Sequence, residues 1–457
     1  MSSDARGEFE ARRERLRRQY AATEPGTPVR LAKTTSNLFR ARRRSSAARL
    51  DVSGLDSVLA VDPVARTADV QGMTTYERLV DATLPYGLMP LVVPQLKTIT
   101  LGGAVTGLGI ESSSFRNGLV HESVLEIEVL TGDGRIVVAR PDNEHRDLFF
   151  GFPNSYGTLG YALRLTIELE PVRPFVKLRH VRFGDRANYF ETIQAVCAER
   201  SFAGERVDFA DGTVFDRDEM YLTLGTFVDD APATSDYTRM GIYYRSLQRR
   251  EVDHLTVHDY LWRWDTDWFW CSRAFGVQDP RVRRLVPKRW LRSDSYWRLV
   301  DLERRYGPKQ RLERMRGRPC REHVVQDVEV PIEHATDFFD FFVREIPIVP
   351  FWICPLRPRD PGARWDLYAL DPEKTYVNVG FWSTVPLANG RPDGSHNRRI
   401  ERVVEELGGR KSLYSTSYYE REEFWRLYNG PAYAALKEAY DADGRLLDLY
   451  GKCVERG

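Results

Sequence analysis

Residues 94–118 (PQLKTITLGGAVTGLGIESSSFRNG) constrain the fold most, because they combine glycines with many hydroxyl side chains. Glycine lets main-chain N–H groups approach an anion closely, and Ser and Thr add hydroxyl donors. The stretch therefore predicts a loop that cradles a pyrophosphate. A tight structural turn would account for two of its glycines, but hardly for Gly102, Gly103, Gly107 and Gly109 together with so many hydroxyl groups.

This loop matches neither common nucleotide-binding pattern. No Gly-Lys-Ser/Thr follows it, as in a P-loop, and residues 107–112 lack the third glycine of the Rossmann fingerprint. A second cluster at 157–160 (GTLG) comes about fifty residues later. A predicted hairpin lies between the clusters, with a turn at 131–134 (TGDG). Two glycine loops flanking a hairpin are more specific than either loop alone.

The pattern of predicted elements changes near residue 172. Residues 50–172 form a mixed unit without a regular βα repeat, and Pro171 and Pro174 mark its end. Strands crossed by helices follow, which predicts a sheet with helices on one face. The predicted strands are 124–130, 163–169, 175–183, 220–228, 323–330 and 376–382, and the predicted helices are 75–85, 187–200, 334–345, 397–407 and 421–440, the last interrupted at 429–431.

Charge and cysteine content limit the classes of function. Lys and Arg total 67 against 66 Asp and Glu, so the net charge of +1 argues against nucleic-acid binding. Five cysteines without a CxxC pair predict free thiols in a reducing compartment. The N-terminus lacks an apolar signal region, and charges and prolines interrupt the apolar stretch 338–356. We therefore expect a cytoplasmic protein that contacts a membrane only at its surface, peripheral at the inner face. The charged helix 1–20 and the basic run 40–49 are expected to be solvated.

Several further motifs carry a family resemblance. They include Thr100-Leu101-Gly102-Gly103, the turn 132–134, the segments 147–149 and 157–160, and the loop 109–114 (GIESSS). The segments 323–327 (HVVQD), 350–355 (PFWICP), 407–411 (LGGRK) and 413–415 (LYS) continue it. The chain resembles the vanillyl-alcohol-oxidase superfamily, with its PCMH-type FAD-binding domain. Within it, the chain is most similar to the delta-24 sterol reductase (seladin, Diminuto) group and to bacterial methylene-fatty-acyl reductases.

The resemblance implies an α+β, two-lobed flavoprotein. Its expected parts are an N-terminal helix (1–20), an FAD-binding domain (21–172), an α+β substrate or cap domain (173–400) and a C-terminal helical segment near the flavin (401–457). The FAD is expected to be non-covalent, because the first loop, 35–39, has no histidine. The expected FAD-contacting residues are Asn37, Thr100, Leu101, Gly102, Gly103, Gly107, Leu108, Gly109, Ile110, Glu111, Ser112, Ser113, Gly118, Gly157, Thr158 and Gly160.

The activity implied is an FAD-dependent, NAD(P)H-driven reduction of a C=C bond in a lipid. NADPH is the expected hydride donor and a methylene-branched fatty-acyl chain the expected substrate, as in the synthesis of tuberculostearic-type fatty acids. Such an enzyme would cooperate with a lipid methyltransferase. The alternatives are a delta-24-type sterol reductase, an alcohol or sugar oxidase that uses oxygen, and a lipid-binding protein on a relict flavoprotein scaffold.

Alkene reduction also needs a positioned acid. Glu111 is a candidate proton donor, or else a solvated loop carboxylate. His323 and Asp327 share one strand face and would form an acid relay, unless the histidine is a satisfied core residue. Lys411 would neutralise the reduced flavin, or else serve as a helix-end cation. Tyr414 would donate a proton or merely pack.

Residues 258–300 hold six of the ten tryptophans, among arginines. We interpret this segment as a membrane-facing or acyl-binding cap, because Trp suits a membrane interface and Arg binds lipid phosphates. The alternative is that Trp262, Trp264, Trp268 and Trp270 pack the cap. His254 and His258 have metal-ligand spacing, but no supporting motif, so no metal site is expected.

Overall fold

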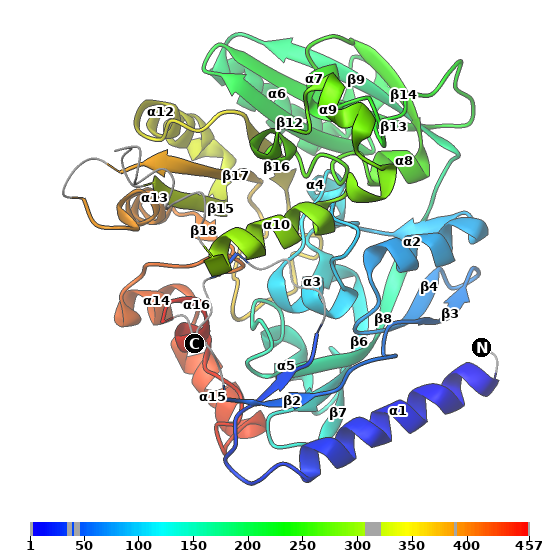
Figure 1. Ribbon diagram of the computed structural model, residues 1–457, viewed down its shortest axis with the longest axis vertical. Helices are drawn as coiled ribbons and strands as arrows, with labels where there is room; N and C mark the ends of the chain where they lie inside the picture. The colour runs from blue at the N-terminus through cyan, green and yellow to red at the C-terminus, as the bar shows by residue number, and fades with distance from the viewer. Residues whose placement is uncertain (1–2, 34–38, 41–45, 307–320, 388–390, 456–457) are drawn as a thin grey trace.

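A computed structural model describes residues 3–33, 39–40, 46–306, 321–387 and 391–455 as two sheet-based lobes (Figure 1). The first sheet has the order β3-β4-β8-β6-β7, with β5 also paired to β8. Its strands are antiparallel: β3 (Val58–Asp62), β4 (Thr67–Gln71), β5 (Leu88–Pro90), β6 (Val124–Thr131), β7 (Ile136–Ala139) and β8 (Gly160–Pro171). Two short strands, β1 (Val29–Leu31) and β2 (Ala48–Leu50), pair in parallel beside this lobe.

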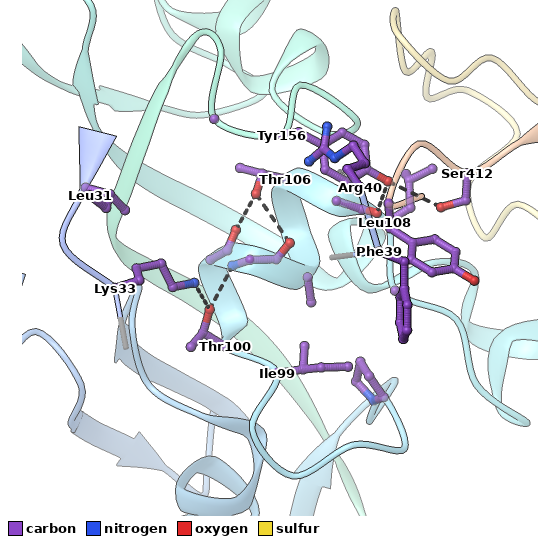
Figure 2. A pocket seen from close by; sticks show the side chains of 18 of the residues that line it. Leu31, Lys33, Phe39, Arg40, Ile99, Thr100, Thr106, Leu108, Tyr156 and Ser412 are labelled. Carbon is purple, nitrogen blue, oxygen red and sulfur yellow. Dashed lines mark hydrogen bonds between the residues drawn. The ribbon is translucent and has the colours of Figure 1, made fainter. Parts of the chain in front are cut away.

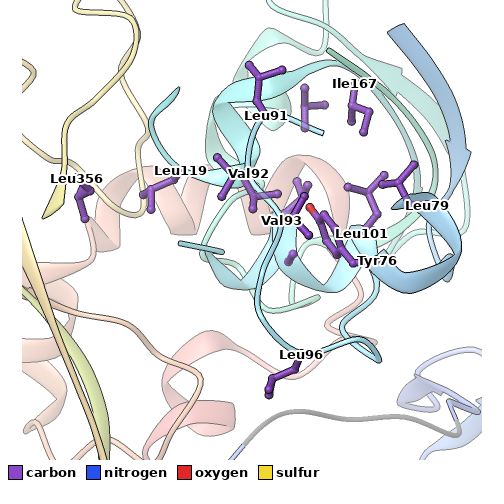
Figure 3. Packing of buried hydrophobic residues seen from close by; sticks show 14 of the residues in the cluster. Tyr76, Leu79, Leu91, Val92, Val93, Leu96, Leu101, Leu119, Ile167 and Leu356 are labelled. Carbon is purple, nitrogen blue, oxygen red and sulfur yellow. The ribbon is translucent and has the colours of Figure 1, made fainter. Parts of the chain in front are cut away.

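The hairpin β6–β7 turns where the sequence predicts it, with Gly134 at φ 85°. The predicted helix over 75–85 is confirmed as α2 (Tyr76–Thr83), which Thr75 caps at its start. Buried side chains of α2 and of α3 (Leu101–Gly107) meet the sheet, among them Tyr76, Leu79 and Leu101 (Figure 3). Two further short helices belong to this lobe, α4 (Ser114–Asn117) and α5 (Arg146–Gly151).

The second sheet is antiparallel, in the order β14-β9-β13-β12-β16-β17-β15-β18. Its strands are β9 (Phe175–Phe183), β12 (Phe209–Asp216), β13 (Glu219–Val228), β14 (Val252–Thr256), β15 (Arg321–Pro331), β16 (Phe351–Leu356), β17 (Tyr376–Pro386) and β18 (Arg410–Lys411). The helices α6 (Arg186–Glu199), α12 (Ala335–Glu345) and α13 (Ser395–Glu406) contact this sheet and, through α12, one another. They share one apolar cluster with it, so the prediction of helices on one face of a sheet is confirmed.

The chain passes from one sheet to the other between Pro171 and Phe175. Irregular chain and short helices then join the lobes: α7 (Tyr243–Ser246), α8 (Val257–Leu261), α9 (Pro280–Leu285) and α10 (Ser293–Tyr306). At the C-terminus α14 (Arg421–Leu427), α15 (Gly430–Tyr440) and α16 (Leu449–Cys453) return to the first lobe, where α15 contacts α5. One buried apolar cluster runs through both lobes and these helices, so the lobes are packed as one body.

Two parts of the N-terminal region are more buried than the sequence predicts. Helix α1 (Ser3–Ala21) is not solvated on all sides, because Phe9, Leu16 and Tyr20 are buried against the first lobe. These residues are seven and four positions apart, so they share one helix face. The many charged residues between them obscure this apolar pattern in the sequence. In the basic run 40–49, which was expected to be solvated, Arg40 is buried and Arg49 is exposed, and residues 41–45 lie outside the described part of the chain. Among the described helices, none is long and apolar enough to cross a bilayer.

Candidate active site

A cavity of about 670 Å³ opens between the lobes, and segments far apart in the sequence line it. The first lobe contributes most of residues 94–110 and part of 156–162, the second contributes Asp327, Glu329, Trp352 and Trp382, and the C-terminal region contributes Ser412, Tyr414 and Lys452. Figure 2 shows Lys33 and Thr100 beside one end of α3, and Arg40, Tyr156 and Ser412 near its other end. The volume is typical of a site for a cofactor or other small molecule.

Helix α3 forms one wall because glycine allows it to approach the first sheet. A Cβ on Gly102 would lie 2.7 Å from the carbonyl oxygen of Gly72, which accepts the Gly102 N–H at 2.9 Å. Thr100 caps the helix by accepting the N–H of Gly103 at 3.3 Å, and Leu101 donates to the carbonyl of Thr74. The first amides of the loop are therefore bonded within the protein, which corrects the expectation that they lie bare for a pyrophosphate.

Unpartnered amides lie at the other end of α3. The N–H groups of Leu108, Gly109 and Ile110 have no hydrogen-bond partner among the described residues, and all three line the cavity. Leu108 holds φ at 60°, in the left-handed region that leucine rarely adopts, and this turns the chain out of the helix. A ligand with hydrogen-bond acceptors along one edge would satisfy these amides.

Backbone strain gathers around the same cavity. Leu108, Tyr156, Trp268 and Phe269 have positive φ values of 45–60° without being glycine, and all four line it. Such strain costs about 1–3 kcal/mol per residue and persists where the surroundings enforce it, most often at functional sites. The cluster therefore marks the cavity as the functional centre of the molecule.

Positive charge collects at the end of the cavity near β1 and β2. Arg30, Lys33 and Arg49 line that end, and the Lys33 ammonium donates to Thr100 Oγ1 at 3.0 Å. Lys452 lines the cavity beside Tyr156, to whose carbonyl oxygen it donates at 2.6 Å. Deeper in, the Arg40 guanidinium lies 4.6 Å from the ring centre of Tyr156, and its buried Nη2 has no partner. Cations and unpartnered donors along one wall suit a phosphate-bearing cofactor whose ring carries carbonyl acceptors. The donor set therefore fits FAD.

The predicted cofactor residues fall into three groups. Thr100, Gly102, Gly103, Gly107, Leu108, Gly109, Ile110, Gly157 and Gly160 line the cavity. Leu101, Glu111, Ser112, Ser113, Gly118 and Thr158 do not line it. All six are buried, and Gly118 also turns the chain at φ 72°. Asn37 lies outside the described residues. Those six residues support the loops rather than line the cavity, because alternate side chains of a tight loop point into the protein.

Aromatic side chains form another part of the cavity wall. Trp268, Phe269, Trp352 and Trp382 line the cavity, and the ring centres of Phe269 and Trp382 lie 4.4 Å apart. The tryptophans at 262, 264, 268 and 270 are all at most 7% exposed, so the expectation that they face a membrane is wrong. They pack the joint between the lobes, and Trp268 also lines the cavity.

Two carboxyl groups of β15 line this aromatic end. Asp327 and Glu329 are two positions apart, so they lie on the same face of the strand. Burial raises the pKa of Asp327 to about 7, although nearby Asn378 and Tyr414 act in the opposite direction. Burial also raises the pKa of Glu329 to about 8, and its carboxylate accepts a hydrogen bond from the Tyr368 hydroxyl. Both side chains can therefore hold a proton near neutral pH.

Tyr414 lies beside Asp327, and its hydroxyl accepts the Trp382 indole N–H at 2.8 Å. Burial raises the pKa of Tyr414 well above its ordinary value, with the Asp327 carboxylate adding to the effect. Tyr414 is therefore a neutral hydroxyl beside the acid.

Three of the predicted catalytic residues lie elsewhere. His323 is exposed on β15, four residues or about 13 Å along the strand from Asp327, so the two form no relay and the histidine is not a core residue. Lys411 is buried on β18 and forms an ion pair with Glu401, so it is neither a flavin contact nor a helix-end cation.

Glu111 is buried behind the cavity and is not a solvated carboxylate. It accepts a hydrogen bond from Arg263 at 2.8 Å, and Arg263 also reaches Asp211 at 3.2 Å. Burial raises the pKa of Glu111, and the Arg263 charge opposes the effect. This cluster joins the loop after α3 to the second sheet and to the segment after α8, so Glu111 helps to hold the lobes together.

Sequence reasoning missed Lys33, Arg40, Tyr156 and Glu329. Lys33 belongs to no pattern, and Arg40 lies in the basic run 40–49, which predicts solvated side chains. The partners of both residues lie more than sixty residues away in the chain. Glu329 had a signal that was overlooked: it follows Asp327 at the strand period of two, in a strand that is otherwise apolar at the alternate positions 324, 328 and 330.

Comparison with known proteins agrees with this site. Residues 18–140 match a family model described as an FAD binding domain. The chain is 27% identical to the Delta(24)-sterol reductase of Homo sapiens over 88% of this chain and 75% of that protein. It is 25% identical to the Arabidopsis thaliana Delta(24)-sterol reductase over 90% of this chain and 77% of that protein. Cytokinin dehydrogenase 9 of Oryza sativa subsp. japonica is 28% identical over 35% of this chain and 30% of its own.

The matched domain and the cavity that fits its cofactor define an FAD-dependent oxidoreductase with a mixed α+β fold. These findings fit the resemblance of the chain to the vanillyl-alcohol-oxidase superfamily of PCMH-type flavoproteins. Within it, the chain is related to the delta-24 sterol reductases.

Proposed function

We propose that the protein reduces a C=C bond in a lipid, with NADPH as the hydride donor and a methylene-branched fatty-acyl chain as the substrate. The observation that carries the proposal is the Asp327 carboxyl group, which stays protonated to about pH 7 inside an aromatic-walled cavity. An unactivated alkene needs hydride at one carbon and a proton at the other, and a buried acid with this pKa suits the second task.

FAD, when bound, would supply the hydride chemistry between the nicotinamide and the alkene. The chain's own residues do the rest. The donor groups of Arg40 and of residues 108–110 would hold the acceptor atoms of the cofactor, and the cationic end would hold its phosphates. Asp327 would deliver its proton to the second carbon and regain one from water.

The walls around Asp327 favour an apolar substrate. Trp268, Phe269, Trp352 and Trp382 offer aromatic surface, and Tyr414 is held neutral. An acyl chain or a sterol side chain would displace water from this surface, which strengthens the hydrogen bonds and charges that remain inside. The overall reaction consumes one alkene, one NADPH and one proton, and yields the saturated lipid and NADP⁺.

A delta-24-type sterol reductase is the second candidate, because full-length relatives of that name cover about 90% of this chain. The choice of a methylene-branched acyl substrate rests on the resemblance to bacterial methylene-fatty-acyl reductases. With that substrate, the partner of the enzyme would be the methyltransferase that installs the methylene group, and the enzyme would act in the cytoplasm.

The test begins with the visible absorption spectrum of the purified protein under anaerobic conditions. NADPH should bleach the flavin bands faster than NADH does. A phospholipid with a methylene-branched acyl chain should then restore them, and mass spectrometry should find one deuterium in the product formed in heavy water. Restoration only by a delta-24 sterol would select the second candidate. Peroxide release with an alcohol and oxygen, without any alkene turnover, would overturn both.

A further inference from the structure

Four large apolar side chains near the joint between the lobes are exposed. Val282 and Leu285 on α9 are 42% and 85% exposed, Trp290 is 57% exposed, and Leu299 on α10 is 48% exposed. Exposed cations surround them, namely Arg281, Arg284, Lys288, Arg289 and Arg298. We call these nine residues the basic-apolar surface.

The fold holds this surface outward by burying one arginine of α9. The Arg283 guanidinium donates to both carboxylate oxygens of Asp267, at 2.7 and 2.9 Å, and is 2% exposed. Asp279 caps the helix and Pro280 begins it. Because Arg283 fixes one side of α9 to the protein, Val282 and Leu285, three positions apart, share a face that meets solvent.

Most cations of this surface form no ion pair within the described part of the chain. Arg281, Arg284, Lys288 and Arg289 form no ion pair with a described residue, and no acidic residue occurs between 280 and 292. Elsewhere many exposed arginines are paired, as Arg15 is with Asp51 and Arg421 with Glu455. In a chain with a net charge of +1, this local excess of cations is an exception.

The basic-apolar surface is continuous with the wall of the cavity. Helix α10 carries Leu299 and Arg298 outward and runs across the boundary between the lobes (Figure 1). On its inner side, the Trp297 ring lies 4.8 Å from that of Phe39 and 6.0 Å from that of Trp268. Phe39 and Trp268 both line the cavity. Helix α10 alone would therefore separate an apolar ligand held at the surface from the cavity.

We propose that the basic-apolar surface docks the protein on a membrane rich in anionic lipid. Exposed Trp, Leu and Val enter the boundary between headgroups and acyl chains, while Arg and Lys pair with lipid phosphates. An acidic protein surface would pair with the cations but would leave the apolar side chains without a matching partner. The inference does not depend on which lipid is reduced, and vesicle binding tests it separately from turnover.

The experiment is co-sedimentation of the FAD-loaded protein with two kinds of vesicle, phosphatidylcholine alone and an equimolar mixture with phosphatidylglycerol. The protein should bind the mixed vesicles and not the neutral ones, and added salt should weaken the binding. Leu285→Ser and Arg284→Glu should each lower the partition coefficient by about tenfold, because the first removes apolar surface from the membrane interface and the second reverses a charge that attracts anionic lipid.

Matched controls change equivalent residues on the first lobe. Val64→Ser alters an apolar side chain that is 92% exposed in the β3–β4 turn, and Arg6→Glu reverses an exposed charge on α1. Both should bind as the unaltered protein does. Failure of the unaltered protein to bind mixed vesicles would overturn the proposal. So would binding that Leu285→Ser and Arg284→Glu leave unchanged, or capture of an acidic protein in place of vesicles.

Discussion

Replacing Asp327 with asparagine should abolish most of the turnover and yet stabilise the folded protein at alkaline pH. The substitution keeps the shape of the side chain and removes its proton. Loss of a positioned general acid lowers rates by about 10²–10⁴-fold. Because Asp327 lies on β15 and not on the loops of the first lobe, the FAD content should not change.

The stability change follows from the raised pKa of the Asp327 carboxyl group. Its ordinary value of 3.8 rises to about 7 in the fold, a difference worth about 4 kcal/mol at 1.36 kcal/mol per pKa unit. As the pH rises above 3.8, the unfolded chain loses this proton while the folded protein keeps it. The folded protein therefore loses stability until the pH passes about 7, where the loss is complete. Asparagine does not titrate and avoids the penalty.

The assay is urea unfolding of both proteins in the same excess of FAD, at about pH 5 and about pH 8. The stability of Asp327→Asn relative to the unaltered protein should rise by roughly 2–3 kcal/mol between these conditions. The turnover of the unaltered protein should also fall above about pH 7, as Asp327 loses its proton. Asp142→Asn, at a carboxylate whose side chain is 84% exposed, is the control and should change neither quantity. A relative stability independent of pH, or turnover close to that of the unaltered protein, would refute the reasoning.

Three further changes test other parts of the site. Gly103→Val places a side chain beside Thr100 at the cavity wall and should abolish flavin binding, measured by absorbance. The control Gly7→Val, with no atom within 4 Å of its Cβ, should bind flavin normally. Full flavin content in Gly103→Val would contradict the loop assignment. Arg263→Met leaves two buried carboxylates without their cation, so it should lower the free energy of unfolding in urea by about 3–5 kcal/mol. The loss should be larger at alkaline than at acidic pH. An equal loss at both would contradict this role of Arg263. Glu329→Gln should keep the fall in turnover rate near pH 7. It should remove any second ionisation, at about pH 8, from the dependence of the turnover rate on pH.

Local patterns in the sequence determined most of the secondary structure. The period-two strands 124–130, 175–183 and 323–330 and the capped helix that begins after Thr75 occur where expected, because alternation and capping act over a few residues. Glycines at 102, 103, 107, 109, 157 and 160 likewise identified the wall of the cavity, since close approach and positive φ require glycine at particular positions.

Only the tertiary structure decided which polar and aromatic groups meet in the cavity. In the sequence, Lys411 and Glu111 are equally plausible site residues. In the structure both are buried, Lys411 in an ion pair with Glu401 and Glu111 in an ion pair with Arg263. The tryptophans at 262–270 and the charged stretch at 281–290 belong to one aromatic and basic segment of the sequence, but the first packs between the lobes and the second is largely exposed. Burial and long-range pairing depend on residues far apart in the chain. The raised pKa of Asp327 and the partner of each arginine are therefore fixed only when both lobes are folded together.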